Sequence, residues 1–430
     1  MRRFQALIAM VLLSSLVLIF FYSTLNLQTT YSRRALPEDI LKHTTLPAHD
    51  SDVTPQDPPL DSKRGSTATP HPDVHNVSLS ASFRQAVPQN GAYWNRLLHS
   101  ILRRLDKGDY TVRHDTSWSW CKETNQELLQ TNVHDFTSYP MLHRDFLRAM
   151  NCRFPPTLID QPNKCTSSEE EADHQTFLLF AIKSNPRNFV RRQAVRETWA
   201  REGVYQSGLR VRTVFLLGSL TLDDPDLGPL LSFEAKRFGD LLQWDFHESL
   251  LNLTLKLNVF LEWSLRNCPH VSFVFSGDDD VFVNTPAILG YLQSLEPSKA
   301  SQSYVGHVIS TATPVRDPKS KYYVPLSFYD GPYPAYAGGG GLLISGALLQ
   351  PLYHISYVIP FFPIDDVYTG MCFKALGISP VSHKGFHTFD VPEQDRENMC
   401  VHKDLMLIHQ RTPEQIKRLW KGIHSPLLTC

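Results

Sequence analysis

Residues 273–283 read FVFSGDDDVFV and place three adjacent carboxylates, Asp278, Asp279 and Asp280, between two apolar runs. The first run has the length and composition of a buried strand, and Ser276-Gly277 is expected to form a turn at its carboxyl end. In open α/β sheets, ligands bind at the carboxyl ends of strands. Three anions beside buried hydrophobic residues repel one another and lose hydration unless a cation or hydrogen-bond donors meet them.

A solvated acidic loop is the alternative interpretation of this triplet. The apolar residues on both sides favour a metal site instead. A hard divalent cation takes oxygen ligands, and when few protein carboxylates hold it, phosphate oxygens complete its coordination. The triplet therefore predicts a divalent-metal site that binds a nucleoside diphosphate.

The composition of the chain sets further bounds. Its 430 residues allow one large domain or two, and 42 basic against 43 acidic residues give no sign of a nucleic-acid partner. None of the seven cysteines shows C-x-x-C spacing, which argues against a zinc ribbon. In an oxidising compartment most of them would pair and at least one would stay unpaired or be intermolecular.

Residues 1–27 are expected to form a cytosolic tail and a transmembrane anchor. The apolar run Ala6–Tyr22 follows Arg2 and Arg3 and would span about 25 Å as a helix. A cleaved signal peptide is the alternative, but no A-x-A-like site follows the run. The two arginines place the amino terminus in the cytosol and the rest of the chain in the lumen.

Three further regions follow the predicted anchor. Residues 28–91 are rich in Pro, Ser, Thr, Asp and His and are expected to form a flexible stem. Residues 92–175 are expected to form an amino-terminal extension of the lumenal domain, and residues 176–430 the catalytic domain. Glycosylation sequons at Asn76 and Asn252 agree with a lumenal location.

Apolar runs of strand length alternate with helical segments from residue 177 onward. The expected strands are Phe177–Ile182, Val211–Leu217, Asp240–Phe246, Phe273–Phe275 and Leu405–Gln410. The expected helices cover 191–199, Leu230–Phe238, Leu250–Leu265, Ala287–Leu295 with Thr285 as N-cap, Leu342–Leu352, and a segment that starts at Asp365. This alternation predicts an α/β fold with a central, mostly parallel sheet covered on both faces.

Basic residues follow the first of these strands. Lys183 lies at its carboxyl end, and the next helix carries Arg192 and Arg196 on one face at i, i+4 spacing. The two arginines either contact a nucleotide or form a solvated helix face, and the spacing does not choose between these interpretations.

A second carboxylate pair, Asp365 and Asp366, begins a helical segment in PIDDVYTG at 363–370. Carboxylates at a helix start bond free backbone amides and offset the helix dipole, so capping is one interpretation. Capping needs only one carboxylate, which leaves the other as a candidate general base for an acceptor hydroxyl.

Aromatic residues and glycines precede this pair. Tyr322 and the string YDGPYPAY that ends in Tyr336 have apolar faces that match sugar rings, although ordinary loops share this composition. Gly338–Gly341 either let a ligand approach the backbone closely or form a hinge. His409 ends the strand Leu405–Gln410, where a lone histidine is more often structural than a ligand.

Taken in order, the acidic triplet, the four glycines and PIDDVYTG resemble the motifs of the β1,3-glycosyltransferases of the Golgi. The sequence is most similar to the β1,3-N-acetylglucosaminyltransferase branch that extends poly-N-acetyllactosamine. The likeness runs from about Tyr93 to Cys430 through IDQPNKC (159–165), RRQAVRETW (191–199), GDDDVFVNT (277–285), KYYVP (321–325), YAGGGG (336–341), PIDDVYTGMC (363–372) and HKGFHTF (383–389).

The resemblance implies a GT-A fold, UDP-N-acetylglucosamine as donor, a Mn²⁺ or Mg²⁺ ion, and inversion at the anomeric carbon. It implies a galactose-terminated glycan on glycoproteins or glycolipids as acceptor. It also implies a single-pass type II protein of the Golgi membrane with a lumenal catalytic domain. Association with a second copy or with other glycosyltransferases is left open.

The resemblance also assigns roles residue by residue. Asp280 would ligate the metal with His409 as co-ligand, and Asp366 would be the general base that takes the proton from the galactose 3-hydroxyl. The implied donor contacts are Lys183, Arg192, Arg196, Asp278, Asp279, Gly339 and Gly340. The implied acceptor contacts are Tyr322, Tyr336 and Asp365.

Other functions stay open at this point. A β1,3-galactosyltransferase would use UDP-galactose on the same fold, and a non-catalytic glycan-binding or partner subunit would retain the fold without the reaction. The presence of both carboxylate sites argues against the non-catalytic subunit. A metal-dependent phosphohydrolase is disfavoured, because two-metal sites recruit more Asp and His ligands than this sequence places.

Overall fold

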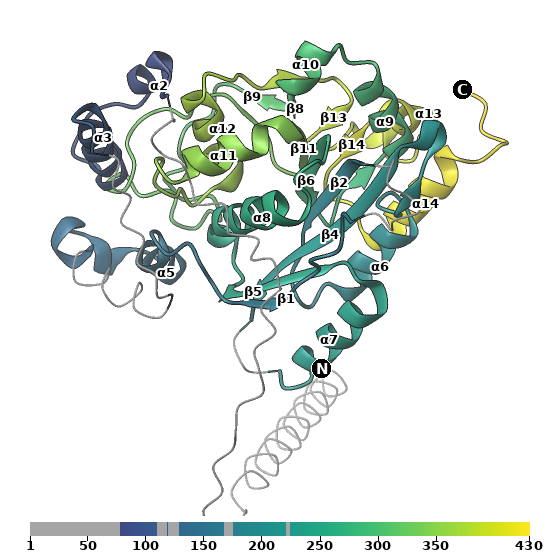
Figure 1. Cartoon of the computed structure of the whole chain (residues 1–430), viewed down its shortest axis with the longest axis horizontal. Helices are drawn as coiled ribbons and strands as arrows, with labels where there is room; N and C mark the ends of the chain where they lie inside the picture. Colours follow the sequence, from purple (N-terminus) through teal and green to yellow (C-terminus); the bar gives the residue numbers. More distant parts are fainter. Residues whose placement is uncertain (1–77, 110–117, 119–128, 167–174, 221–223) are drawn as a thin grey trace, which may run out of the picture. The chain divides into compact units, whose positions relative to one another are not determined.

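The computed structural model describes residues 78–109, 118, 129–166, 175–220 and 224–430, all within one structural unit (Figure 1). The predicted anchor, most of the predicted stem and the Asn76 sequon lie outside the described residues. Among the helices that the structure does describe, none is both long enough and apolar enough to cross a membrane.

A mixed sheet forms the centre of the fold, with strand order β1-β5-β4-β2-β6-β11-β8-β12 and β3 paired to β4. The strands are β1 (Thr157–Ile159), β2 (Thr176–Lys183), β3 (Gly203–Val204), β4 (Arg210–Ser219), β5 (Leu241–His247), β6 (Phe273–Asp278), β8 (Tyr304–Gly306), β11 (Gly341–Ser345) and β12 (Val381–Ser382). Strands β5, β4, β2 and β6 run parallel to one another, whereas β11 is antiparallel to both β6 and β8. The predicted α/β class is confirmed, but only one half of the sheet is parallel.

Two small sheets complete the strands: β9 (Val308–Ile309) pairs with β10 (Tyr336–Ala337), and β7 (Phe282–Val283), β14 (Leu407–Ile408) and β13 (Phe386–His387) form the other. The predicted strand Leu405–Gln410 is confirmed in its central residues. The helices are α2 (Ala81–Ala86), α3 (Tyr93–Asp106), α5 (Met141–Ala149), α6 (Phe189–Glu197), α7 (Leu227–Phe238), α8 (Leu253–Asn267), α9 (Thr285–Gln293), α10 (Pro297–Ser301), α11 (Leu349–Ser356), α12 (Asp365–Ala375), α13 (Met399–Asp404) and α14 (Pro413–Ile423).

Helices cover both faces of the sheet, as predicted. Helices α8, α11 and α12 lie on one side, and α6, α7 and α14 on the other (Figure 1). Side chains of β2 alternate between two hydrophobic cores: Leu179 and Ala181 belong to the first, Leu178 and Phe180 to the second. Both faces of β2 are therefore buried, which explains its continuous apolar sequence.

The helix predicted at Leu342–Leu352 is wrong in its first half. Gly341–Ser345 is the strand β11, with every residue buried, and α11 begins only at Leu349. An apolar run without a polar face is equally typical of a strand buried on both sides, and five residues are too few to separate the two structures. Hydrogen bonding to both β6 and β8 stabilises this run as a strand.

A smaller correction concerns the start of α9. Its N-cap is Asn284, whose side chain accepts a hydrogen bond from the backbone amide of Ala287. The predicted cap, Thr285, is fully buried and donates its hydroxyl to the backbone oxygen of Trp199 instead.

Disulfides join Cys165 to Cys268 and Cys400 to Cys430, and Cys152 is also disulfide-bonded. Cys372 is a buried free thiol, and burial raises its pKa to about 12. These pairings confirm the prediction that most cysteines would pair while at least one would not.

The folded part begins before the predicted boundary at residue 92. Helix α2 packs against α12, Phe83 is fully buried, and the backbone amide of Ser80 donates to the backbone oxygen of Ala375. The stem prediction is therefore wrong for residues 78–91. A mostly polar composition hides a segment that is held by the buried Phe83 and by the hydrogen bonds of Ser80.

We predict that Phe83→Ala lowers the free energy of unfolding of the full-length protein by about 3–5 kcal/mol, because it leaves a cavity in a closed core. Thermal and denaturant unfolding would measure the change. Gln85→Ala, an exposed substitution in the same helix, should change it by less than about 0.5 kcal/mol. Equal stability of the two variants would show that α2 adds nothing to the fold.

Candidate functional site

Three potential metal ligands come together beyond the carboxyl end of β6. Pairing of β14 with β7 brings His409 to the acidic triplet, and the backbone oxygen of Asp280 accepts from the amide of Arg411. His409 Nε2 lies 3.3 Å from Asp280 Oδ1 and 3.8 Å from Asp278 Oδ2. One atom from each of these three residues lies within 4.8 Å of the others.

The chemistry of this group fits a divalent cation. His409 Nδ1 lies 3.2 Å from the backbone oxygen of Thr388, and donation there leaves the Nε2 lone pair directed at the carboxylates. Asp280 Oδ1 is buried and makes no hydrogen bond to any described residue. Burial raises the pKa of Asp280, but the nearby His409 and the charge of Arg191 more than offset it and lower the pKa. Carboxylate oxygens and one imidazole nitrogen suit Mn²⁺ or Mg²⁺.

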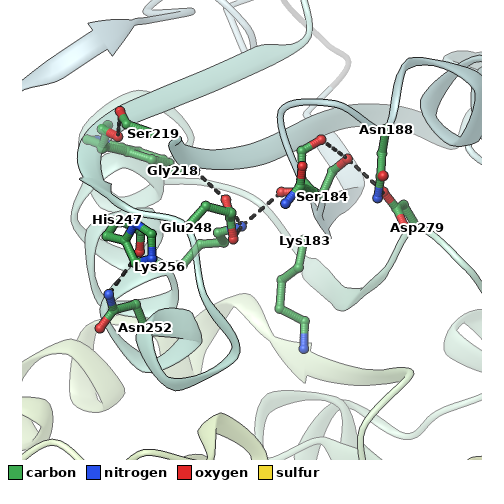
Figure 2. A network of polar contacts seen from close by, with 12 residues as sticks. Lys183, Ser184, Asn188, Gly218, Ser219, His247, Glu248, Asn252, Lys256 and Asp279 are labelled. Atoms are coloured by element: carbon green, nitrogen blue, oxygen red, sulfur yellow. Dashed lines mark hydrogen bonds and ion pairs between the residues drawn. The ribbon is translucent and has the colours of Figure 1, made fainter. Parts of the chain in front are cut away.

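The middle carboxylate of the triplet has a different environment. Asp279 Oδ2 accepts hydrogen bonds from Ser184 Oγ at 2.7 Å and Asn188 Nδ2 at 2.8 Å (Figure 2). Burial raises the pKa of Asp279, and these donors lower it in part. Asp279 therefore anchors the turn to the loop after β2. Its predicted contact with the donor sugar or ribose stays a prediction.

Arg192 and Arg196 lie in buried ion pairs. Arg192 is fully buried, with Nη2 at 2.6 Å from Glu234 Oε2 and Nη1 at 2.7 Å from the backbone oxygen of Asn185. Arg196 binds Glu234 and Asp240, each at 2.7 Å. Neither a solvated helix face nor a nucleotide contact fits this arrangement, since the guanidinium groups are already engaged inside the protein.

Arg191 is the arginine that the sequence reasoning missed. Its Nη1 lies 3.3 Å from Asp280 Oδ2 and 3.5 Å from Asp279 Oδ1, and its side chain is 37% exposed. The i, i+4 pattern selected the inner face of α6, whereas Arg191 points to the carboxylates from its other face. The doubled arginine in RRQAV was the available signal, because two adjacent helical residues point in different directions.

A buried ion pair lies behind the loop that holds Asp279. Lys256 Nζ binds both carboxylate oxygens of Glu248, at 2.7 and 2.8 Å, and donates to the backbone oxygen of Ser184 at 2.9 Å (Figure 2). Glu248 also accepts from the backbone amide of Gly218 at 2.6 Å. The pair ties the ends of β2 and β4 together. No motif predicted it, because its members become neighbours only in the folded chain.

Lys183 joins the acidic triplet to the second carboxylate pair. Its Nζ lies 3.1 Å from Asp278 Oδ1 and 2.8 Å from Asp365 Oδ2. Burial lowers the pKa of Lys183, but the two carboxylates outweigh this effect and raise it, so the side chain is charged. Lys183 thus bridges the two acidic sites, which were predicted from separate parts of the sequence.

Asp366 lies at the start of α12, as predicted. Its Oδ1 accepts from the amide of Val367 at 2.8 Å, and its Oδ2 accepts from the amide of Gly339 at 2.9 Å. Burial and the charge of Asp365 raise the pKa of Asp366 to about 7. Each carboxylate oxygen has two lone pairs, so both keep one for a further donor. Helix capping and proton transfer are therefore compatible roles.

One cleft contains the second carboxylate pair together with Lys183, the side chain that also binds Asp278. It is lined by Lys183, Leu216, Leu257, Ser276, the glycines Gly338–Gly341, Leu342, Ile344, Asp365, Asp366 and Thr369. Gly339 and Gly340 line this cleft, Gly339 beside Asp366 and Gly340 beside His409. Their contact with a donor stays a prediction.

The remaining candidates differ in exposure. Tyr322 is 43% exposed and can offer its ring, whereas Tyr336 is 8% exposed and packs against α12. Asp365 is held by Lys183. The amide of Asn252 is buried and donates to the backbone oxygen of His247, so the fold does not present this sequon for a glycan.

Comparison with known proteins shows the family to which this chain belongs. The galactosyltransferase family model matches residues 190–384. Mouse N-acetyllactosaminide β1,3-N-acetylglucosaminyltransferase 2 is 45% identical over 351 residues, which cover 79% of this chain and 86% of the relative. Human UDP-GlcNAc:βGal β1,3-N-acetylglucosaminyltransferase 8 is 40% identical over 365 residues, covering 84% and 88%. The chain belongs to the galactosyltransferase family of glycosyltransferases, among its β1,3-N-acetylglucosaminyltransferases.

We predict that Asp280→Asn weakens Mn²⁺ binding to the full-length protein roughly tenfold or more, since even the loss of an outer partner of a ligand costs about that much. Calorimetric titration with Mn²⁺ would measure it. Asp404→Asn, an exposed substitution in α13, is the control and should bind as the parent does. Unchanged binding in Asp280→Asn would exclude this carboxylate as a ligand.

Proposed function

We propose that this protein is an inverting, metal-dependent transferase that moves N-acetylglucosamine from UDP-N-acetylglucosamine in β1,3 linkage to terminal galactose of N-acetyllactosamine-type glycans. One observation carries the proposal: Lys183, which lines the same cleft as the candidate base Asp366, lies 3.1 Å from Asp278 of the candidate metal group and 2.8 Å from Asp365. The names of the two relatives given above support the choice of donor sugar and acceptor.

The donor would be held at the triplet side of the cleft. Asp278, Asp280 and His409 would hold a Mn²⁺ or Mg²⁺ ion, which when bound would neutralise charge on the departing diphosphate. Arg191, exposed beside Asp280, would add positive charge there. The α/β fold with its half-parallel sheet supports the proposed GT-A class.

The acceptor would react at Asp366. Its carboxylate would take the proton of the galactose 3-hydroxyl as that oxygen bonds to the anomeric carbon and the bond to UDP breaks. Backbone amides of Gly339 and Val367 fix both carboxylate oxygens, so the base would not need to reorganise during the reaction. Attack opposite the leaving UDP would invert the configuration.

The location is proposed on the sequence alone. Residues 1–27 would anchor the chain in the Golgi membrane with a short cytosolic tail, and the described part would lie in the lumen. The disulfides are consistent with an oxidising compartment. Glycosylation at Asn76 and association with other glycosyltransferases belong to the same proposal.

We predict that the full-length protein with Mn²⁺ transfers sugar to N-acetyllactosamine from UDP-N-acetylglucosamine at least about tenfold faster than from UDP-galactose. Mass spectrometry of the product would identify the added sugar. Resistance of the substituted galactose to periodate would show that the sugar is attached at the 3-hydroxyl. A preference for UDP-galactose would establish the galactosyltransferase alternative. Release of UDP without a transferred sugar from either donor would contradict both.

We predict that kcat/KM falls about tenfold per pH unit below about 7, the raised pKa of Asp366, because the base acts only when ionised. A pH profile measured at saturating Mn²⁺ would show it. Asp366→Asn should abolish transfer while leaving UDP affinity within about twofold of the parent, as in the Asp404→Asn control. Transfer at the parent rate by Asp366→Asn would show that another group is the base.

A further inference from the structure

The four consecutive glycines, Gly338–Gly341, differ in what a side chain would meet at each position. A Cβ on Gly338 would lie 2.8 Å from Ile309 Cδ1, and a Cβ on Gly341 would collide with Leu407 and lie 2.5 Å from Phe275 Cζ. Gly340 has a φ of +95° and would place a Cβ 3.0 Å from the ring of His409. Backbone conformation at Gly340 and packing at Gly338 and Gly341 therefore disfavour a side chain at these three positions.

Gly339 is different. Its φ lies outside the left-handed region, and among the described residues a Cβ built on it would meet only Asp366 Oδ2, at 3.5 Å, an ordinary van der Waals distance. The protein itself therefore has room for a side chain at this position. The bare Cα faces the cleft beside the candidate base.

The space at Gly339 lies where a substrate must arrive. Asp366 Oδ2 already accepts the amide of Gly339 and keeps one lone pair. A proton acceptor must come within hydrogen-bond distance of the reacting hydroxyl, about 2.6–3.2 Å. A Cβ at 3.5 Å from the same oxygen would occupy part of the approach to it.

A hydroxyl on a sugar ring needs more room to reach the carboxylate than the hydroxyl of a water molecule does. The carbon that bears it is joined to two further ring carbons, so the edge of the ring follows the hydroxyl toward the carboxylate. A methyl group on Gly339 would meet this edge, whereas a water molecule, which has no such substituents, could still reach Oδ2.

We propose that the bare Cα of Gly339 forms the floor of the acceptor subsite, on which the edge of a pyranose ring rests while its secondary hydroxyl bonds to Asp366. The inference rests on the proposed function and deepens it. It moves Gly339 from the donor side, where the sequence resemblance had placed it, to the acceptor side. Gly340 keeps its place beside His409.

The test compares Gly339→Ala with Gly290→Ala in the full-length protein. Gly290 lies in α9, where a Cβ would meet nothing within 4 Å among the described residues, so it is a matched control. Gly339→Ala should lower kcat/KM for the galactose acceptor roughly tenfold or more, as expected for a displaced reactant. The Kd of UDP with Mn²⁺ and the Tm should stay at the parent values. Gly290→Ala should leave kcat/KM and the Kd of UDP unchanged, and its Tm should not fall, because alanine favours a helix more than glycine does.

Two further readouts separate a steric effect from a structural one. The ratio of UDP-N-acetylglucosamine hydrolysis to transfer should rise in Gly339→Ala, because water is smaller than the ring edge. Gly339→Val should lower acceptor kcat/KM further than Gly339→Ala. Gly340→Ala should instead lower the Tm, because its backbone conformation disfavours a Cβ.

Each contrary result has a distinct meaning. Parent-like transfer by Gly339→Ala would overturn the acceptor subsite while the proposed function stands. An equal loss of UDP affinity would place Gly339 against the donor, and a lowered Tm would make it a structural glycine; either overturns the inference. Absence of transfer to any galactose acceptor by the parent protein would overturn the proposed function, and the subsite with it.

Discussion

Lys183 lies between two carboxylates that belong to different parts of the chain, Asp278 at the end of β6 and Asp365 at the start of α12. Without a cation between them, these half-buried anions would repel each other across the cleft. The ammonium group is held at the carboxyl end of β2, in the middle of the sheet. Its position therefore fixes the spacing between the acidic triplet and the second carboxylate pair.

The antiparallel strand β11 is the second part of this arrangement. Because it runs opposite to β6, its first residues lie beside the last residues of β6, with Gly341 opposite Gly277. The amide of Asp278 donates to the backbone oxygen of Gly340 at 3.0 Å. A Cβ on Gly277 would lie 2.8 Å from that same oxygen, so glycine permits the close approach of the two strands. A fully parallel sheet would not bring the four glycines to the candidate metal ligands in this way.

The features predicted correctly from the sequence are those whose signal lies in a short local pattern. Apolar runs revealed the strands β2, β4, β5 and β6, and paired carboxylates revealed both acidic sites, because each signal lies within a few consecutive residues. Strand β11 was missed because a short apolar run has no periodicity to read.

Local patterns did not predict ion pairs between residues that are far apart in the sequence. The choice of Arg192 over Arg191 depended on which helix face meets Glu234, a residue 42 positions away from Arg192. The pair of Lys256 and Glu248 gave no signal either, since a buried charge is recognisable only with its partner in place. A resemblance to a family identifies motifs, whereas the inner or outer direction of each side chain follows from packing.

The acidic triplet shows why its three aspartates are not interchangeable. Asp278 is balanced by Lys183, Asp279 by Ser184 and Asn188, and Asp280 by His409 together with Arg191. Each like charge thus has its own partner from a different element, which offsets a repulsion that would otherwise oppose folding. Asp278 and Asp280 keep oxygens directed at His409. Asp279 instead accepts hydrogen bonds from the loop after β2. The turn can therefore offer two carboxylates as candidate ligands for a cation because its third carboxylate holds it in place.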